Sequence, residues 1–316
     1  MSPSEVVPRF IREIYRVRPD LKVTRTAIHK ILFEVKATLP ENDPERGYLP
    51  FYWYKYGPYS EVVESSLDSM KRQGVLREEK TETGKTLLVL NASPGDPGSV
   101  CEDGLSAVVG RIVRGIDPYR IGTFVDRIYW DYAPYEFMPR YKVDFLPGFE
   151  GCLASRLEGQ RTLSQWSLCD PETPDIDRLE DALYMCEAAL VEDPLFRDFN
   201  DEFVAYASGA GKAFDIARMD ESIMRPVILA TQAVALEIWY TFAGGVRILE
   251  GGHDDYYNGR LGRWEQEYRK TLSALAPMVS TYTGYIRESA GRIPSREPDE
   301  RRKRILSSLI EGYFSI

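Results

Sequence analysis

The chain has 316 residues, of which 43% are hydrophobic and 28% charged, a composition typical of a soluble globular protein with one large or two medium domains. Its net charge of -9 excludes a protein that coats nucleic acid or anionic membranes non-specifically. Residues 1–91 hold 15 Lys and Arg against 13 Asp and Glu, so the negative charge lies in the remainder of the chain.

The cysteines and histidines do not form a metal-binding pattern. No two cysteines are spaced as CxxC, and the chain has only two histidines, which argues against a zinc ribbon or finger. Scattered cysteines indicate reduced thiols, and the N-terminus lacks the apolar core of a signal peptide. We therefore expect a cytoplasmic protein without a metal or cofactor. The residues concerned are Cys101, Cys152, Cys169, Cys186, His29 and His253.

The first two predicted elements are helices, over residues 4–16 and 24–37. Apolar residues recur along one face of each at helical spacing. Thr24 is suited to begin the second helix, because a threonine side chain can accept a hydrogen bond from the first turn.

A strand, a helix and a hairpin follow. Residues 48–56, YLPFYWYKY, predict an aromatic strand, which a Gly-Pro pair then breaks. Ser60 is suited to cap a helix over residues 61–73, and Gly74 to end it. Two further strands up to residue 90 surround a Thr-Gly turn. Three helices, an aromatic strand and a closing hairpin are the parts of a winged helix-turn-helix.

The aromatic strand has two interpretations. Its rings could stack on the bases of single-stranded nucleic acid. Few cations surround them in the sequence, so packing in a core or interface is favoured.

This region resembles the Panacea, or SocA-like, antitoxin domains and related uncharacterised prokaryotic proteins. The resemblance covers about residues 20–91; residues 100–316 show no recognisable match. It implies a winged-helix variant in a prokaryotic protein and an antitoxin-like role. The matching residues are Tyr56, Gly57, Pro58, Tyr59, Ser60, Leu67, Gly74 and Leu76.

The remainder of the chain is predicted to be mainly helical. Residues 92–103 read as a linker rich in Gly, Pro and Ser. The fold class is therefore mainly α, with a winged-helix domain over 1–91 that is α+β and an α-helical domain over 104–316. Residues 134–174 are expected to be irregular. Helices are predicted over 104–115, 119–131, 176–192, 197–208, 220–243, 257–289 and 298–313.

One of these segments is long enough to cross a membrane. Residues 225–247 are apolar, but Gln232 and Glu237 lie inside them, and a carboxylate at mid-span is costly. We expect the core helix of a soluble helical domain instead, with Glu237 facing a buried partner or a cavity, and no association with membranes.

The third helix is poorly suited to reading DNA. Glu61, Glu64 and Asp68 form one acidic stripe, which would repel phosphates at close range. Cations toward the end of the helix and on the hairpin could hold a DNA backbone without specifying sequence. These residues are Lys71, Arg72, Arg77, Lys80 and Lys85.

A basic stripe on the first helix has the same spacing as the acidic one. Arg9, Arg12 and Arg16 should lie on an exposed face, as should the acidic residues. The two stripes could pair within the domain, between two copies, or with a third protein. We expect at least one stripe in a protein interface; plain solvated faces are the alternative.

Local patterns give little support for an enzyme. His253, Asp254 and Asp255 cluster in a loop, where Asp254 or Asp255 capping the next helix is favoured over a metal or acid–base site. The chain has no P-loop, no GxGxxG and no GxSxG sequence.

The sequence thus favours a regulatory or protein-interaction protein of a prokaryotic cytoplasm, with a protein partner or a homodimer. A DNA-binding regulator whose helical domain dimerises or senses a ligand is the alternative. An enzyme with a site in the helical domain is the third.

Overall fold

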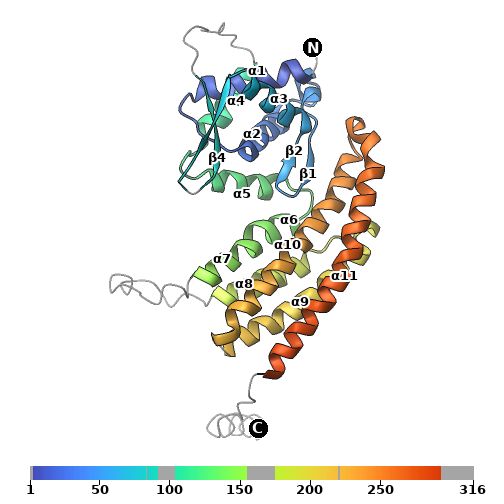
Figure 1. Cartoon of the computed structure of the whole chain (residues 1–316). Coiled ribbons are helices and arrows are strands. Elements are labelled where there is room, and N and C mark those ends of the chain that lie inside the picture. The colour runs from blue at the N-terminus through green and yellow to red at the C-terminus, as the bar shows by residue number, and fades with distance from the viewer. Residues whose placement is uncertain (1–2, 83, 92–103, 155–174, 220, 293–316) are drawn as a thin grey trace, which may run out of the picture.

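The computed structural model describes residues 3–82, 84–91, 104–154, 175–219 and 221–292. The fold is mainly helical, as the sequence predicts. Two groups of elements follow each other along the chain (Figure 1). We call the elements from α1 to α5 the N-terminal unit and those from α6 to α11 the helical bundle.

The helices of the N-terminal unit begin where the sequence places their caps. The Thr24 hydroxyl accepts a hydrogen bond from the backbone N–H of Ala27, and the Ser60 hydroxyl accepts one from Val63. The apolar faces of these helices form a shared core. The bounds are Pro3–Val17 for α1, Arg25–Thr38 for α2, Pro44–Tyr48 for the short 3₁₀ helix η1, and Glu61–Arg72 for α3.

Two antiparallel hairpins complete this unit. The aromatic strand is shorter than predicted: β1 covers Tyr52–Tyr54 and pairs with β2, Gly57–Tyr59. The Gly-Pro pair therefore continues the sheet after a tight turn instead of ending it, because Gly57 adopts a positive φ of 90°. The second hairpin joins β3, Leu76–Lys80, to β4, Thr86–Leu90, as expected.

The first two helices after the linker pack on the N-terminal unit. α4, Gly104–Arg114, lies against α1 and α2, and α5, Ile121–Tyr132, lies against α2. Tyr129 of α5 also packs against Trp53 of β1, with ring centres 5.5 Å apart. Spatially, the N-terminal unit thus continues to α5, beyond the boundary that linker composition suggests.

The expectation that residues 134–174 are irregular is wrong for residues 137–154. This stretch is a continuous helix made of α6, Phe137–Pro139, a π-helical segment η2, Arg140–Phe145, and α7, Leu146–Ala154. Its prolines and glycines suggest breaks, but a row of aromatics at a spacing of four holds it on the core. Each is 0% exposed: Phe137, Tyr141, Phe145 and Phe149.

Three long helices, α9, α10 and α11, pack on one another and form the body of the bundle. α9 extends beyond its predicted end through Gly209. The absence of a side chain at Gly209 lets the ring of Tyr282 in α11 pack closely against this part of the helix. The predicted helix over 298–313 lies outside the described residues. The bounds are Asp175–Ala188 for α8, Pro194–Phe196 for η4, Arg197–Met219 for α9, Glu221–Gly251 for α10, Asp255–Arg260 for η5, and Leu261–Arg292 for α11.

α10 is the core helix that the sequence predicts. Residues 222–251 are long and apolar enough to cross a membrane, but most of that apolar stretch is buried between other helices, as in a soluble protein. The expectation for Glu237 is wrong: its side chain is exposed, because it lies on the outer face of α10.

Candidate functional site

An ion-pair network fixes the outer side of α3 to α2. Arg25, at the first position of α2, binds Glu64, Asp68 at 2.8 Å and Glu78 of β3 at 3.3 Å. Lys71 also binds Glu78, at 2.6 Å. Two members of the acidic stripe are therefore neutralised within the chain.

The carboxylate of Glu64 also contacts a buried histidine. His29 of α2 accepts a hydrogen bond at Nδ1 from the backbone N–H of Ser60, so its Nε2–H is directed to Glu64, 3.1 Å away. The imidazole stacks on Tyr59 at 4.7 Å. Burial lowers the pKa of His29, and the hydrogen bond from His29 lowers the pKa of Glu64. His29 is thus a neutral bridge that positions the start of α3.

The third acidic residue connects the N-terminal unit to the bundle. Glu61, in the first turn of α3, forms an ion pair with Arg260 of η5. The guanidinium also lies beside the rings of Tyr256 and Tyr257. This ion pair therefore ties the first turn of α3 to the bundle.

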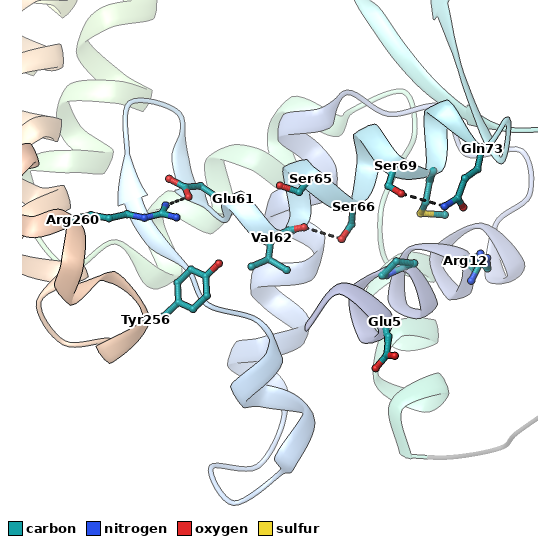
Figure 2. A pocket seen from close by; sticks show the side chains of 12 residues that line it. Glu5, Arg12, Glu61, Val62, Ser65, Ser66, Ser69, Gln73, Tyr256 and Arg260 are labelled. Carbon is teal, nitrogen blue, oxygen red and sulfur yellow. Dashed lines mark hydrogen bonds and ion pairs between the residues drawn. The ribbon is translucent and has the colours of Figure 1, made fainter. Parts of the chain in front are cut away.

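A groove of about 760 Å³ opens beside this contact, between α1, α3 and η5 (Figure 2). Pro8, Val62 and Met70 supply its apolar surface. α3 and its C-cap residue Gln73 contribute a polar row, in which Ser66 donates to the Val62 carbonyl at 2.8 Å and Gln73 donates to Ser69 at 3.2 Å. We call this the α1–α3 groove. Its remaining lining residues are Glu5, Arg12, Glu61, Ser65, Tyr256 and Arg260.

The charges of the groove are balanced. Glu5 and Arg12 of α1 border one side, and Glu61 and Arg260 border the end near η5 (Figure 2). A phosphate backbone requires an excess of cations, which this lining does not offer. Hydroxyl and amide groups over an apolar base are suited to a polypeptide segment.

The three arginines of the basic stripe on α1 have different neighbours. Arg9 pairs with Glu45 of η1, and Arg16 pairs with Glu13 at 2.6 Å. Arg12 is exposed and lines the α1–α3 groove. The basic and acidic stripes do not contact each other in any ion pair among the described residues.

The proposed DNA-backbone cations lie at the far end of α3 and on the β3–β4 hairpin. Arg77 pairs with Glu79 at 2.7 Å, and Arg72 donates to the backbone carbonyl of Asp68 at 3.4 Å. Lys80 and Lys85 are exposed near the hairpin turn. Since Lys71 is also paired, acidic neighbours offset much of this positive charge.

The aromatic β1–β2 hairpin holds the N-terminal unit on the bundle. Tyr52 packs against Tyr257 and Trp264, with ring centres 4.9 and 4.8 Å away. Tyr257 donates a hydrogen bond to the backbone carbonyl of Pro50 at 3.0 Å. Burial raises the pKa of Tyr52 to about 12. We call this contact region the aromatic joint.

An arginine and a tryptophan of α10 complete the joint. The guanidinium of Arg247 lies between Tyr54 and Trp264, 4.3 and 4.8 Å from the ring centres. The indole N–H of Trp239 donates to the Lys55 carbonyl at 2.8 Å. Cation–π contacts are strongest when desolvated, and Arg247 is buried. The aromatic strand thus supplies a packing surface, which is the interpretation that its sequence favours.

A fully buried lysine lies at the edge of the joint. Lys30 of α2 donates to the Tyr56 carbonyl and lies 5.9 Å from the ring centre of Tyr129. Burial, with a smaller contribution from nearby Lys142, lowers the pKa of Lys30 to about 7. A neutral amine at this position avoids the cost of a buried charge.

The His253 loop is a helix cap. Asp254 accepts a hydrogen bond from the backbone N–H of Tyr256 and begins η5, as the sequence favours. The described residues contain no group of three or more His, Cys, Asp or Glu side chains that could hold a metal.

Sequence reasoning missed several residues that define these sites. Arg25, Arg260 and Arg247 contact partners far away in the chain, and no local pattern marks Arg260 or Arg247. The one available signal was for Arg25, which directly follows the helix cap Thr24 and so must lie near the start of α2.

No protein-family model, curated protein or solved structure matches the chain.

Proposed function

We propose that this is a regulatory, antitoxin-like protein of a prokaryotic cytoplasm, built on a winged-helix variant, which binds a segment of a protein partner in the α1–α3 groove. The observation that carries the proposal is the groove itself: about 760 Å³, charge-balanced, and lined by hydroxyl groups over an apolar base. Such a lining offers hydrogen bonds to a peptide backbone and contact area to apolar side chains.

The surroundings of α3 support a protein partner over DNA. Glu61 holds the N-terminal end of α3 against η5, and Arg25 neutralises Glu64 and Asp68. Entry of α3 into a major groove would require separation of the Glu61–Arg260 contact and would bring carboxylates toward phosphates. A partner that binds beside α3 requires neither change.

DNA binding is the second candidate, and exposed Lys80 and Lys85 on the β3–β4 hairpin favour it. A hairpin with free lysines could contact a phosphate backbone in the manner of a wing. Fluorescence anisotropy with random duplex across a salt series tests this function. We expect weak binding; micromolar affinity at physiological salt with a steep salt dependence would favour DNA over a protein partner.

Site-specific photocrosslinking tests the protein-binding proposal. A photoreactive residue at exposed Ser65, in the groove, should capture one defined protein in cells of the source organism. The matched control is Ser273, an exposed serine of α11 outside the groove, which should not capture that protein.

The identity of the captured molecule decides between the outcomes. A crosslink from Ser65 to a second copy of the chain would identify a homodimer as the form of the interaction. Equal capture from Ser65 and Ser273, or capture of nucleic acid alone, would overturn the proposal.

A further inference from the structure

An apolar groove of about 520 Å³ lies between α10 and α11 on the surface of the bundle. Small side chains of α10, Ala230 and Ala233, line one side, and Tyr282 is buried at its base. Met278 and Tyr285 of α11 are 36% and 37% exposed there, although both are large and apolar. Grooves lined by exposed apolar side chains are among the surfaces on which amphipathic helices pack.

The α11 side of this groove has a characteristic spacing. Its lining residues recur at i, i+1, i+4, i+5 and i+8, which places them on one face of the helix. These residues are Pro277, Met278, Thr281, Tyr282 and Tyr285. The sequence after α11 repeats the same spacing with apolar side chains on the predicted helix over 298–313. Those residues are Ile305, Leu306, Leu309, Ile310 and Tyr313.

The chain that follows α11 has the length to reach the groove. Residues 293–297 would connect two helices, and connections of about 2–8 residues join antiparallel helices. A turn centred on residue 295 places Ile305 opposite Tyr285, and Leu309 opposite Thr281. At about 1.5 Å per residue, a helix from 298 to 313 extends about 22 Å, which reaches back as far as Pro277.

The same register brings opposite charges together. Arg302 would lie on the groove-facing side, one turn before Leu306, and opposite Glu288. Glu288 is exposed near the end of α11. Apolar spacing, connection length and charge thus agree on one arrangement.

We propose that the C-terminal segment 298–313 of the same chain packs antiparallel to α11 and occupies the α10–α11 groove. The segment covers Met278 and Tyr285 and completes the bundle. This site is separate from the α1–α3 groove and does not depend on the function proposed for it.

Cysteine pairing in the full chain tests the register. Thr281→Cys combined with Leu309→Cys should form an intrachain disulfide under mild oxidation, because the two positions face each other. Peptide mass spectrometry identifies the bond. Each variant with one added cysteine, oxidised in the same way, shows how much disulfide forms with the native cysteines. Thr281→Cys with Glu311→Cys is the matched control, since the proposed helix would place residue 311 on its opposite face.

The expected result is a disulfide in the first pair and little in the control. Covalent dimers would show that the segment of a second copy occupies the groove. Equal yields of intrachain disulfide from both pairs would show that the segment does not pack in a fixed register on α11. Either outcome overturns the proposal.

A second measurement does not depend on disulfide geometry. In a Met278→Cys background, Leu309→Glu should raise the rate of maleimide labelling at residue 278 several-fold, while Ser308→Glu, on the outward face, should not. An equal rate in both variants would show that the segment does not cover the groove.

Discussion

Tyr256 and Tyr257 are adjacent in η5, yet they face two contrasting regions. Tyr257 is 0% exposed in the aromatic joint, where it contacts Tyr52 and donates to the Pro50 carbonyl. Tyr256 is 47% exposed and lines the α1–α3 groove. The same short segment therefore supplies one residue to a completed internal contact and one to an open surface.

The comparison separates residues that hold the chain together from residues available to a partner. In the joint, rings, carbonyls and the Arg247 guanidinium already have partners within the chain. In the groove, Ser65 and Tyr256 are exposed to solvent. Substitutions in the joint should therefore affect mainly stability, and substitutions in the groove mainly binding.

The largest effect is expected at the joint. Tyr52→Ala should lower the free energy of unfolding by about 3–5 kcal/mol, as for other large buried aromatics, because it leaves a cavity beside Tyr257 and Trp264. Tyr256→Ala is the matched control and should cost less than about 1 kcal/mol. Urea denaturation measures both values; equal losses would remove the distinction between the two regions.

A second effect depends on pH and arises from Lys30. Its pKa is about 7 in the folded protein and 10.5 in the reference state, so above pH 7 the unfolded chain binds more protons. The cost of burying Lys30 is therefore greatest below pH 7 and falls as pH rises. Relative to Lys30→Met, the parent protein should gain about 3 kcal/mol of stability between pH 7 and 9.5.

The measurement is urea denaturation of both proteins across that pH range. The difference between the two proteins cancels the titration of the tyrosines, which both proteins share. Lys85→Met, at an exposed position, should show no such gain. A difference that stays constant with pH would show that Lys30 is charged throughout.

A smaller effect is expected in the network around α3. Glu64→Gln should cost about 1–2 kcal/mol at pH 7, because Glu64 accepts charged hydrogen bonds from Arg25 and contacts His29. The pKa of Glu64 is lowered in the folded protein, so this stability is present above its ordinary pKa and lost as pH falls through the folded one. The penalty should therefore shrink in acid.

Asp68→Asn is the control within the same network. Asp68 also binds Arg25 but is more exposed than Glu64, so its loss should cost about 0–1 kcal/mol. Equal penalties for the two substitutions would show that contact with His29 adds nothing.

Local signals were sufficient for much of the N-terminal unit. Thr24 and Ser60 begin their helices where hydroxyl caps are expected, and Gly74, with a φ of 72°, follows α3 where only glycine is relaxed. The helix over 137–154 was missed because Pro139 and Pro147 suggest breaks. Aromatics at intervals of four from Phe137 were the available signal.

The sequence does not predict which residues contact each other within each site. Glu61 and Arg260 are separated by most of the chain, as are Tyr52 and Trp264. The acidic stripe is visible in the sequence, but which cations approach it depends on how α2 and the bundle pack against α3. Composition likewise places the domain boundary at the linker, whereas in the fold α4 packs on α1 and α2, and α5 packs on α2.

The smallest effect on stability is expected in the groove, where the effect on binding should be large. Ser65 is exposed, so Ser65→Arg should change the free energy of unfolding by no more than about 0.5 kcal/mol. Its longer, charged side chain would nevertheless fill part of the groove and disturb the charge balance between Arg12, Arg260 and the two glutamates.

With a photoreactive residue at Gln73, on the same groove, capture of the partner should fall at least tenfold in the Ser65→Arg variant. Ser273→Arg adds the same charge on α11 and should leave capture unchanged. If Ser65→Arg lowers stability by as much as Tyr52→Ala, the groove is a structural contact like the joint; if it leaves both stability and capture intact, the partner binds elsewhere.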